Sequence, residues 1–185
     1  MDNTAFIAPY VPCHPDVGAA AVSFARVSSQ DVLVDLGCGD ARVLLSALSS
    51  TTPPQRCIGV ELDPHLVEHI QSLPEAKPHI DSSTLTILEQ DMFKVNLSDL
   101  KATAMILYLL PAGLEKLKSQ LETWLRDDGG AQKKRIVTIT YSITGWEPHH
   151  AKQTFLEPGV RKLAPMGGSS GISQWLFYYD VTSIR

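Results

Sequence analysis

The chain has 185 residues, a formal net charge of −4 and 44% hydrophobic residues. This length favours one domain spanning 1–185, and the acidic balance argues against broad nucleic-acid binding, which needs a basic surface. No apolar run is long enough to cross a bilayer, so we expect a soluble protein.

The cysteines and the N-terminal residues indicate the cellular compartment of the protein. Cys13, Cys38 and Cys57 show no metal-ligand spacing, and an odd number of cysteines favours a reducing compartment. The chain has no Lys or Arg before Arg26, which disfavours a signal or transit peptide. We therefore expect a cytoplasmic protein, with the nucleus and the mitochondrion left open.

The chain begins with a predicted arm and helix, together 1–30. Pro12 and Pro15 prevent a continuous helix through the arm. Asp16 is a candidate N-cap for a helix that runs to about Arg26.

Residues 31–42 are the centre of the predicted site. The apolar run 32–34 predicts a buried strand, Gly37 and Gly39 break it, and a helix follows from about residue 41. A strand that turns through glycines into a helix places backbone N–H groups and a helix N-terminus beside a nucleotide-like ligand.

The charges of this turn indicate which class of ligand it can bind. Asp35 and Asp40 would repel a pyrophosphate, and Arg42 stands where the dinucleotide fingerprint requires its third glycine. The turn suits a ligand with cationic groups and no phosphate. S-adenosylmethionine, a sulfonium that also carries an ammonium, is the biological candidate.

The next βαβ unit supplies a second acid. Residues 56–62 predict a strand with Glu61 at its end, 22 residues after Gly39. At this spacing an acidic side chain reaches the ribose hydroxyls of a bound nucleoside, and one carboxylate can accept both hydroxyl hydrogens. Asp63 and Pro64 are expected to begin the crossover helix.

This crossover helix contains a misleading motif. His65, Glu68 and His69 match the His-x-x-Glu-His pattern of zinc proteases. Because the helix already serves as a crossover and the chain is short for a peptidase, we expect a solvated helix face and no metal site.

Two later strands approach the same crevice. Pro74 and Pro78 are expected to end the helix, and 82–88 predicts a third strand that leads into the turn at Asp91. The apolar run 104–110 predicts a central parallel strand, and Tyr108 is its polar exception. Tyr108 either faces the transferred methyl group or is a core tyrosine with a satisfied hydroxyl.

The remaining chain predicts a helix and an antiparallel end. Residues 114–125 have helical spacing, and the triplet 133–135 is expected to be a solvated entry to the strand 136–140, which closes a core of 31–140. In 141–185, two strands at about 152–156 and 173–182 predict a closing hairpin. Residues 146–150 are a candidate substrate rim.

The motif Asp35-Leu-Gly37-Cys-Gly39-Asp-Ala41 resembles motif I of the class I, seven-strand methyltransferases. It departs at Ala41, where the family has glycine; alanine adds a methyl group and is the better helix former. Similarity extends over nearly the whole chain and is strongest to protein lysine methyltransferases related to the ATP synthase c-subunit and adenine nucleotide translocase enzymes. The segments that carry it are 10–12, 34–39, 59–64, 91–95 and 108–111.

The resemblance implies a Rossmann-like, doubly wound α/β sheet of seven strands, mostly parallel with an antiparallel C-terminal hairpin. It implies S-adenosylmethionine as cofactor and a protein substrate that presents a lysine, with nucleic acid not expected as a partner. The resemblance implies that Tyr108 orients the substrate. It also implies seven cofactor-binding residues: Tyr10 as a wall of the pocket, Asp35, Gly37 and Gly39 of motif I, Glu61 at the ribose, and Asp91 and Met92 at the adenine.

Two other functions fit the same sequence. One is a small-molecule or RNA methyltransferase of the same fold. The other is an inactive partner subunit that binds the cofactor, for which Ala41 would be a first sign of decay.

Overall fold

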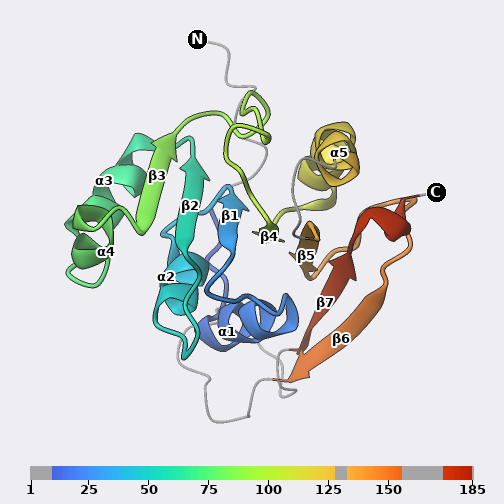
Figure 1. The fold of residues 1–185 in the computed structure, drawn as a ribbon, viewed down its shortest axis with the longest axis horizontal. Helices are drawn as coiled ribbons and strands as arrows, with labels where there is room; N and C mark the ends of the chain where they lie inside the picture. Colours follow the sequence, from blue (N-terminus) through green and yellow to red (C-terminus); the bar gives the residue numbers. More distant parts are fainter. Residues whose placement is uncertain (1–9, 128–132, 156–172, 185) are drawn as a thin grey trace.

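The computed structural model of the chain describes residues 10–127, 133–155 and 173–184 (Figure 1). Within them, seven strands form one sheet in the order β3-β2-β1-β4-β5-β7-β6. The five N-terminal strands are parallel, whereas β7 is antiparallel to β5 and β6. The strands are β1 (Val32–Leu36), β2 (Arg56–Glu61), β3 (Leu85–Glu89), β4 (Ala104–Leu107), β5 (Arg135–Ile139), β6 (His150–Phe155) and β7 (Ser173–Tyr179).

This sheet confirms the predicted fold class. Strands β1, β4 and β5 are buried almost throughout, which is why their sequences are mostly apolar, with Asp35, Arg135 and Thr138 as the polar exceptions. The segment 156–172, predicted to join the strands of the hairpin, lies outside the described residues.

Helices cover both faces of the sheet (Figure 1). One core cluster contains apolar side chains of α1, α2 and α3, and a second cluster on the other face contains those of α5. The helices are α1 (Pro15–Phe24), α2 (Arg42–Leu48), α3 (Pro64–Ser72), α4 (Lys77–Asp81), α5 (Pro111–Arg126) and the short 3₁₀ helix η1 (Val181–Ser183).

The strand order reverses between β1 and β4. From β1 the chain moves outward to β2 and β3, then returns to pair β4 with the opposite side of β1. In open α/β sheets, a crevice for ligands forms at the carboxyl ends of the strands at such a switch point. The topology therefore places a site beside the ends of β1 and β4.

Some predicted boundaries differ from the structure. The N-cap of α1 is His14, whose ring accepts a hydrogen bond from the backbone N–H of Asp16, so the prediction of Asp16 as the cap is wrong. Pro78 lies in the first turn of α4, where proline is tolerated because the N–H is unpaired there anyway. The third strand consequently begins at Leu85, later than predicted.

The prediction of a solvated entry to β5 is wrong for Arg135. Its guanidinium is buried and donates to both carboxylate oxygens of Asp31, at 3.0 and 2.7 Å. It also donates to the carbonyls of Ala25 and Arg26. Burial raises the pKa of Asp31, but hydrogen bonds from Arg135 and Thr103 outweigh it and lower that pKa to about 2.

We expect Arg135→Lys to lower the free energy of unfolding by about 2 kcal/mol, because one ammonium cannot replace a fork that binds a carboxylate and two carbonyls. In the native protein, the folded pKa of Asp31 lies below its ordinary value of 3.8. Its stabilisation is therefore present above about pH 4 and is lost as the pH falls toward 2. Urea unfolding at pH 7 and pH 3 measures both effects.

The control is Lys133→Arg, at the exposed position of the same triplet, which should leave stability unchanged. If Arg135→Lys and Lys133→Arg unfold at the same urea concentration, the buried pair does not stabilise the fold.

Candidate active site

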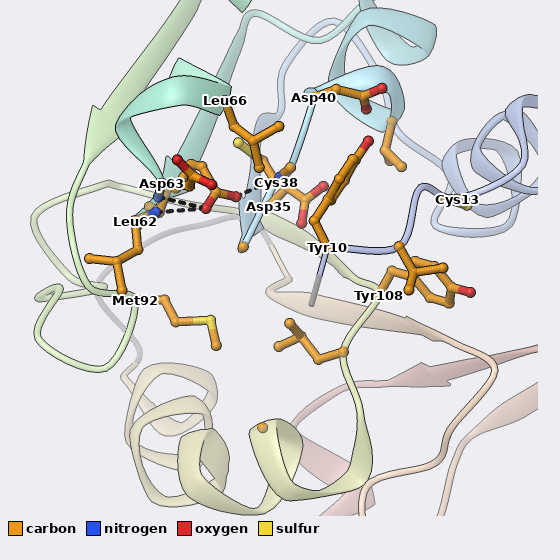
Figure 2. A pocket seen from close by; sticks show the side chains of 18 of the residues that line it. Tyr10, Cys13, Asp35, Cys38, Asp40, Leu62, Asp63, Leu66, Met92 and Tyr108 are labelled. Carbon is orange, nitrogen blue, oxygen red and sulfur yellow. Dashed lines mark hydrogen bonds between the residues drawn. The ribbon is translucent and has the colours of Figure 1, made fainter. Parts of the chain in front are cut away.

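A pocket of about 800 Å³ opens at the carboxyl ends of β1, β2 and β4 (Figure 2). The structure brings all eight residues predicted for cofactor binding or catalysis to its lining: Tyr10, Asp35, Gly37, Gly39, Glu61, Asp91, Met92 and Tyr108. This volume suits a cofactor-sized ligand. The individual binding roles remain predictions.

The glycine turn directs its backbone donors toward β2. The N–H groups of Gly37 and Cys38 donate to the carbonyl of Val60, at 2.8 and 3.0 Å. The N–H of Gly39 donates to a carboxylate oxygen of Glu61, at 2.8 Å. Because these donors are already engaged, the turn does not form the N–H cradle that a phosphate requires.

Ala41, the departure from motif I, has a left-handed backbone with φ 60° and ψ 14°. It is fully buried and is the N-cap of α2, so its helix propensity is not relevant at this position. Only glycine adopts this conformation routinely. The turn therefore keeps a glycine-like path with alanine in place.

We expect Ala41→Gly to change the free energy of unfolding by less than about 0.5 kcal/mol. Relief of the left-handed conformation, about 1 to 2 kcal/mol, offsets the lost methyl group and the greater freedom of unfolded glycine. The matched control is Ala47→Gly, in α2 and equally buried, which should lose about 2 kcal/mol. Equal losses in thermal unfolding would contradict the left-handed assignment.

Asp35 provides a buried carboxyl on the floor of the pocket, 4% exposed. Among the described residues, no hydrogen bond to its carboxyl is found. Burial, followed by the charges of Glu61 and Asp40, raises its pKa to about 8. A cationic ligand is therefore the partner that would let this carboxyl ionise at neutral pH.

Glu61 closes the end of β2 against the glycine turn. Its Oε2 accepts from the N–H of Gly39, and its Oε1 accepts from the N–H groups of Leu62 and Asp63, at 2.8 and 3.0 Å (Figure 2). A carboxylate offers about four acceptor sites, so these bonds leave about one for a ligand. Binding two ribose hydroxyls would require one of the present bonds to be exchanged.

Asp91 and Met92 lie in the turn after β3. The Asp91 carboxylate accepts from the N–H of Phe93 at 3.0 Å and lies 3.7 Å from the ammonium of Lys94. Asp91 therefore caps its turn with the same carboxylate that is predicted to bind the adenine. Because both residues also line the pocket, their predicted contact with an adenine ring remains open to test.

Tyr10 covers the glycine turn from the N-terminal arm (Figure 2). Its ring lies so close to Gly39 that a Cβ there would be 2.3 Å from the ring. Burial and a hydrogen bond with Asp40 raise the pKa of Tyr10 to about 12. Arg42 donates to the Asp40 carboxylate and, at 2.8 Å, to the carbonyl of Cys13, so it ties the arm to the turn.

Tyr108 lines the pocket, but its hydroxyl is turned away from Asp35 (Figure 2). The Nε2 of Gln174 donates to that hydroxyl at 3.3 Å. The hydroxyl therefore has a partner in β7, as expected of a core tyrosine, while the residue also lines the pocket. A role in orienting the substrate is left as a prediction.

The three cysteines are free and buried; Cys13 and Cys38 line the pocket, whereas Cys57 lies near the start of β2. Burial, followed by the charge of Asp35, raises the pKa of Cys13 and Cys57 to about 12 and that of Cys38 well above its ordinary value. The zinc-like motif lies elsewhere, with His65 and His69 exposed on α3. In the described part of the chain, no cluster of His, Cys, Asp and Glu could hold a metal ion.

Sequence reasoning missed the pocket residues that follow β5. Thr140 and Tyr141 line the cavity together with Leu109 and Leu110, which follow β4. Their position directly after parallel strands was the signal that could have found them, because side chains there face the crevice. Residues 146–150, predicted as a substrate rim, do not line this pocket among the described residues, and His150 is the first residue of β6.

This strand order, with a glycine turn after β1 and carboxyls at the ends of β1 and β2, defines an S-adenosylmethionine-dependent methyltransferase of the class I fold. A crystal structure of an RNA methyltransferase from Salinibacter ruber in complex with S-adenosylhomocysteine is similar over 92% of this chain and 94% of that one. Its TM-score is 0.68 and its sequence is 25% identical.

The chain belongs to the ANTKMT methyltransferase domain family, which it matches over residues 35–150. It is 31% identical to a protein-lysine N-methyltransferase of Saccharolobus islandicus (strain REY15A), over 76% of this chain and 81% of that protein. It is 25% identical to the lysine N-methyltransferase of Xenopus laevis that acts on the ATP synthase c-subunit, over 80% of this chain but 63% of that protein. S-adenosylmethionine is thus the methyl donor of this enzyme.

Proposed function

We propose that this methyltransferase transfers methyl groups to lysine side chains of a protein. Two relatives act on lysine, and one of them is 31% identical over most of its length. The Salinibacter structure supports RNA as the alternative acceptor. The charge of the pocket favours a lysine acceptor over RNA.

The observation that carries the proposal is the shortage of free cations in the pocket. Among its described lining residues, Arg42 is the one Lys or Arg, and it is committed to Asp40 and Cys13. Five lining residues are acidic: Asp35, Asp40, Glu61, Asp63 and Asp91. An RNA backbone requires cations, whereas an acidic pocket attracts the ammonium of a lysine.

The rim of the pocket suits the chemistry of an amine. Bound S-adenosylmethionine supplies a methyl group on a sulfonium, and transfer forms one carbon–nitrogen bond, breaks one carbon–sulfur bond and leaves a neutral thioether. Lysine must first lose a proton from a pKa near 10.4. Val11, Leu110 and Tyr141 are apolar groups at the pocket that would lower this pKa by desolvation, and alignment with the exclusion of water supplies the rest.

We separately propose that the protein is located in the cytoplasm. This location is supported by three free cysteines, which fit a reducing compartment. In the described residues, no helix combines the length and apolarity that crossing a membrane requires. Fractionation of cells that express the tagged protein would test the location.

The acceptor is tested with S-adenosylmethionine labelled in its methyl group. The enzyme and a cell extract are incubated with it, portions are treated with ribonuclease or protease, and labelled protein is hydrolysed to amino acids. We expect the label to resist ribonuclease and to appear in methylated lysine. Label in RNA, in small molecules or on another amino acid would contradict the proposal.

A further inference from the structure

The turn after β5 has an unusual backbone conformation. Thr140 has φ 73°, and the N–H of Tyr141 donates to the carbonyl of Ile139 at 2.9 Å. A hydrogen bond across one residue with positive φ marks the strained form of the γ-turn. Positive φ is a genuine outlier for a β-branched residue such as threonine.

Neighbouring strands hold this strained turn in place. The hydroxyl of the buried Thr138 donates to the carbonyl of Tyr141 at 2.6 Å, and the N–H of Thr140 donates to the carbonyl of Trp175 in β7 at 2.7 Å. The Thr140 hydroxyl is buried and has no hydrogen-bond partner among the described residues. Such a conformation persists only where surrounding structure enforces it, and strain of this kind clusters at functional sites.

The turn places Tyr141 at the pocket. Its side chain lines the cavity and is 38% exposed. It follows β5, on the far side of β1 and β4 from Glu61 and Asp91, which follow β2 and β3. Tyr141 thus lies on the opposite side of the pocket from the predicted ribose and adenine contacts, the side that those contacts leave for a methyl acceptor.

We propose that Tyr141 binds the methyl acceptor and that the strained turn at Thr140 positions it. This rests on the proposed function, in which the acceptor is a lysine amine. The face of a tyrosine ring packs against methylene groups and attracts an ammonium. A fixed ring holds the amine in line with the methyl group, and alignment of this kind supplies much of the rate of a group transfer.

The test uses a probe that needs no identified substrate. The probe is an S-adenosylhomocysteine analogue with nitrogen in place of sulfur, bearing a propylamine arm that mimics the acceptor. Calorimetry compares its affinity with that of the same nitrogen analogue carrying a methyl group in place of the arm, and S-adenosylhomocysteine is titrated alongside as the cofactor control. We expect the arm to improve binding at least tenfold in the native enzyme.

In Tyr141→Ala we expect most of this tenfold gain to be lost, with the affinity for S-adenosylhomocysteine unchanged within twofold. Tyr141→Phe should keep the gain because the ring is kept. Thr138→Val should lose part of it, because it removes the hydroxyl that holds the carbonyl of Tyr141. The control is Val181→Ala, an apolar side chain of similar exposure that does not line the pocket. It should keep the full gain.

An equal gain in Tyr141→Ala and the native enzyme would overturn the proposal, as would absence of any gain in the native enzyme. A parallel loss of S-adenosylhomocysteine binding would instead make Tyr141 part of the cofactor site and overturn it too. The methyl-labelling experiment tests the proposed function separately: label on a residue other than lysine would contradict that function without bearing on the binding measured here.

Discussion

Asp35→Asn is expected to weaken S-adenosylmethionine binding at least 100-fold and to make the free protein more stable. The carboxylate is the buried negative group on the pocket floor, so its loss removes the counter-charge for a cationic ligand. A 100-fold change corresponds to about 3 kcal/mol. Stability should move the other way, because asparagine does not have to ionise in a buried site.

The gain in stability should depend on pH. The unfolded carboxyl loses its proton near pH 4, whereas burial raises the folded pKa to about 8. Between these values the folded state holds one more proton than the unfolded state, so native stability falls as the pH rises. Asp35→Asn lacks this fall in stability, so its advantage over the native protein should grow from pH 4 to pH 8 and reach the order of 5 kcal/mol.

Cofactor affinity in the native protein should rise with pH over the same range. Binding requires the ionised carboxyl, so affinity increases up to tenfold per pH unit between pH 6 and 7, where the α-ammonium of the ligand stays charged. Calorimetry and urea unfolding at several pH values measure both effects. The control is Asp99→Asn, an exposed carboxylate outside the pocket lining. A pH-independent affinity in the native protein would contradict the role of Asp35.

Glu61→Gln should weaken cofactor binding about 100-fold and also destabilise the protein, by about 2 kcal/mol. The Glu61 carboxylate accepts three backbone N–H groups, which join β2 to the glycine turn. Glutamine keeps one oxygen and presents an amide N–H₂ to the remaining donors, so those donors lose their partner. The turn that shapes the pocket is then no longer held.

The matched control for Glu61 is Glu89→Gln. Glu89 ends the neighbouring strand and pairs with Glu61 across the sheet, but it is exposed and does not line the pocket. Thermal unfolding and calorimetry should show little change in Glu89→Gln. Two acid-to-amide changes in one pocket, Asp35→Asn and Glu61→Gln, should therefore shift stability in opposite directions. A shift in the same direction would mean that one of the two carboxyl environments is wrongly assigned.

The cofactor half of the site could be predicted because it depends on local patterns. An apolar run before Gly37 fixes the end of β1, and 22 residues of a βαβ unit bring Glu61 beside Gly39, where the structure places a 2.8 Å hydrogen bond. Parallel strands meet at one edge of the sheet, so spacing alone predicts such neighbours.

Features that depend on distant or strained residues could not be predicted. Arg135 is buried because Asp31, 104 residues earlier, lies against it, and a basic triplet gives no sign of that partner. Thr140 has a strained φ that no propensity favours, so the turn before Tyr141 could not be found. Helix α4 was missed because Pro78 was interpreted as a stop, although proline also fits the first turn of a helix.

The alkylation rate of Cys38 can be used to measure how often the glycine turn opens. The Cys38 thiol lies between Gly37 and Gly39, is 7% exposed, and has a pKa well above the ordinary value. Since the thiolate is the reactive form, alkylation of Cys38 should be slow while the turn is closed and faster when the turn opens to solvent. The alkylation rate therefore reports local opening of the glycine turn, and the measurement needs no attached fluorescent label. Bound S-adenosylmethionine that holds the turn closed would lower the alkylation rate of Cys38.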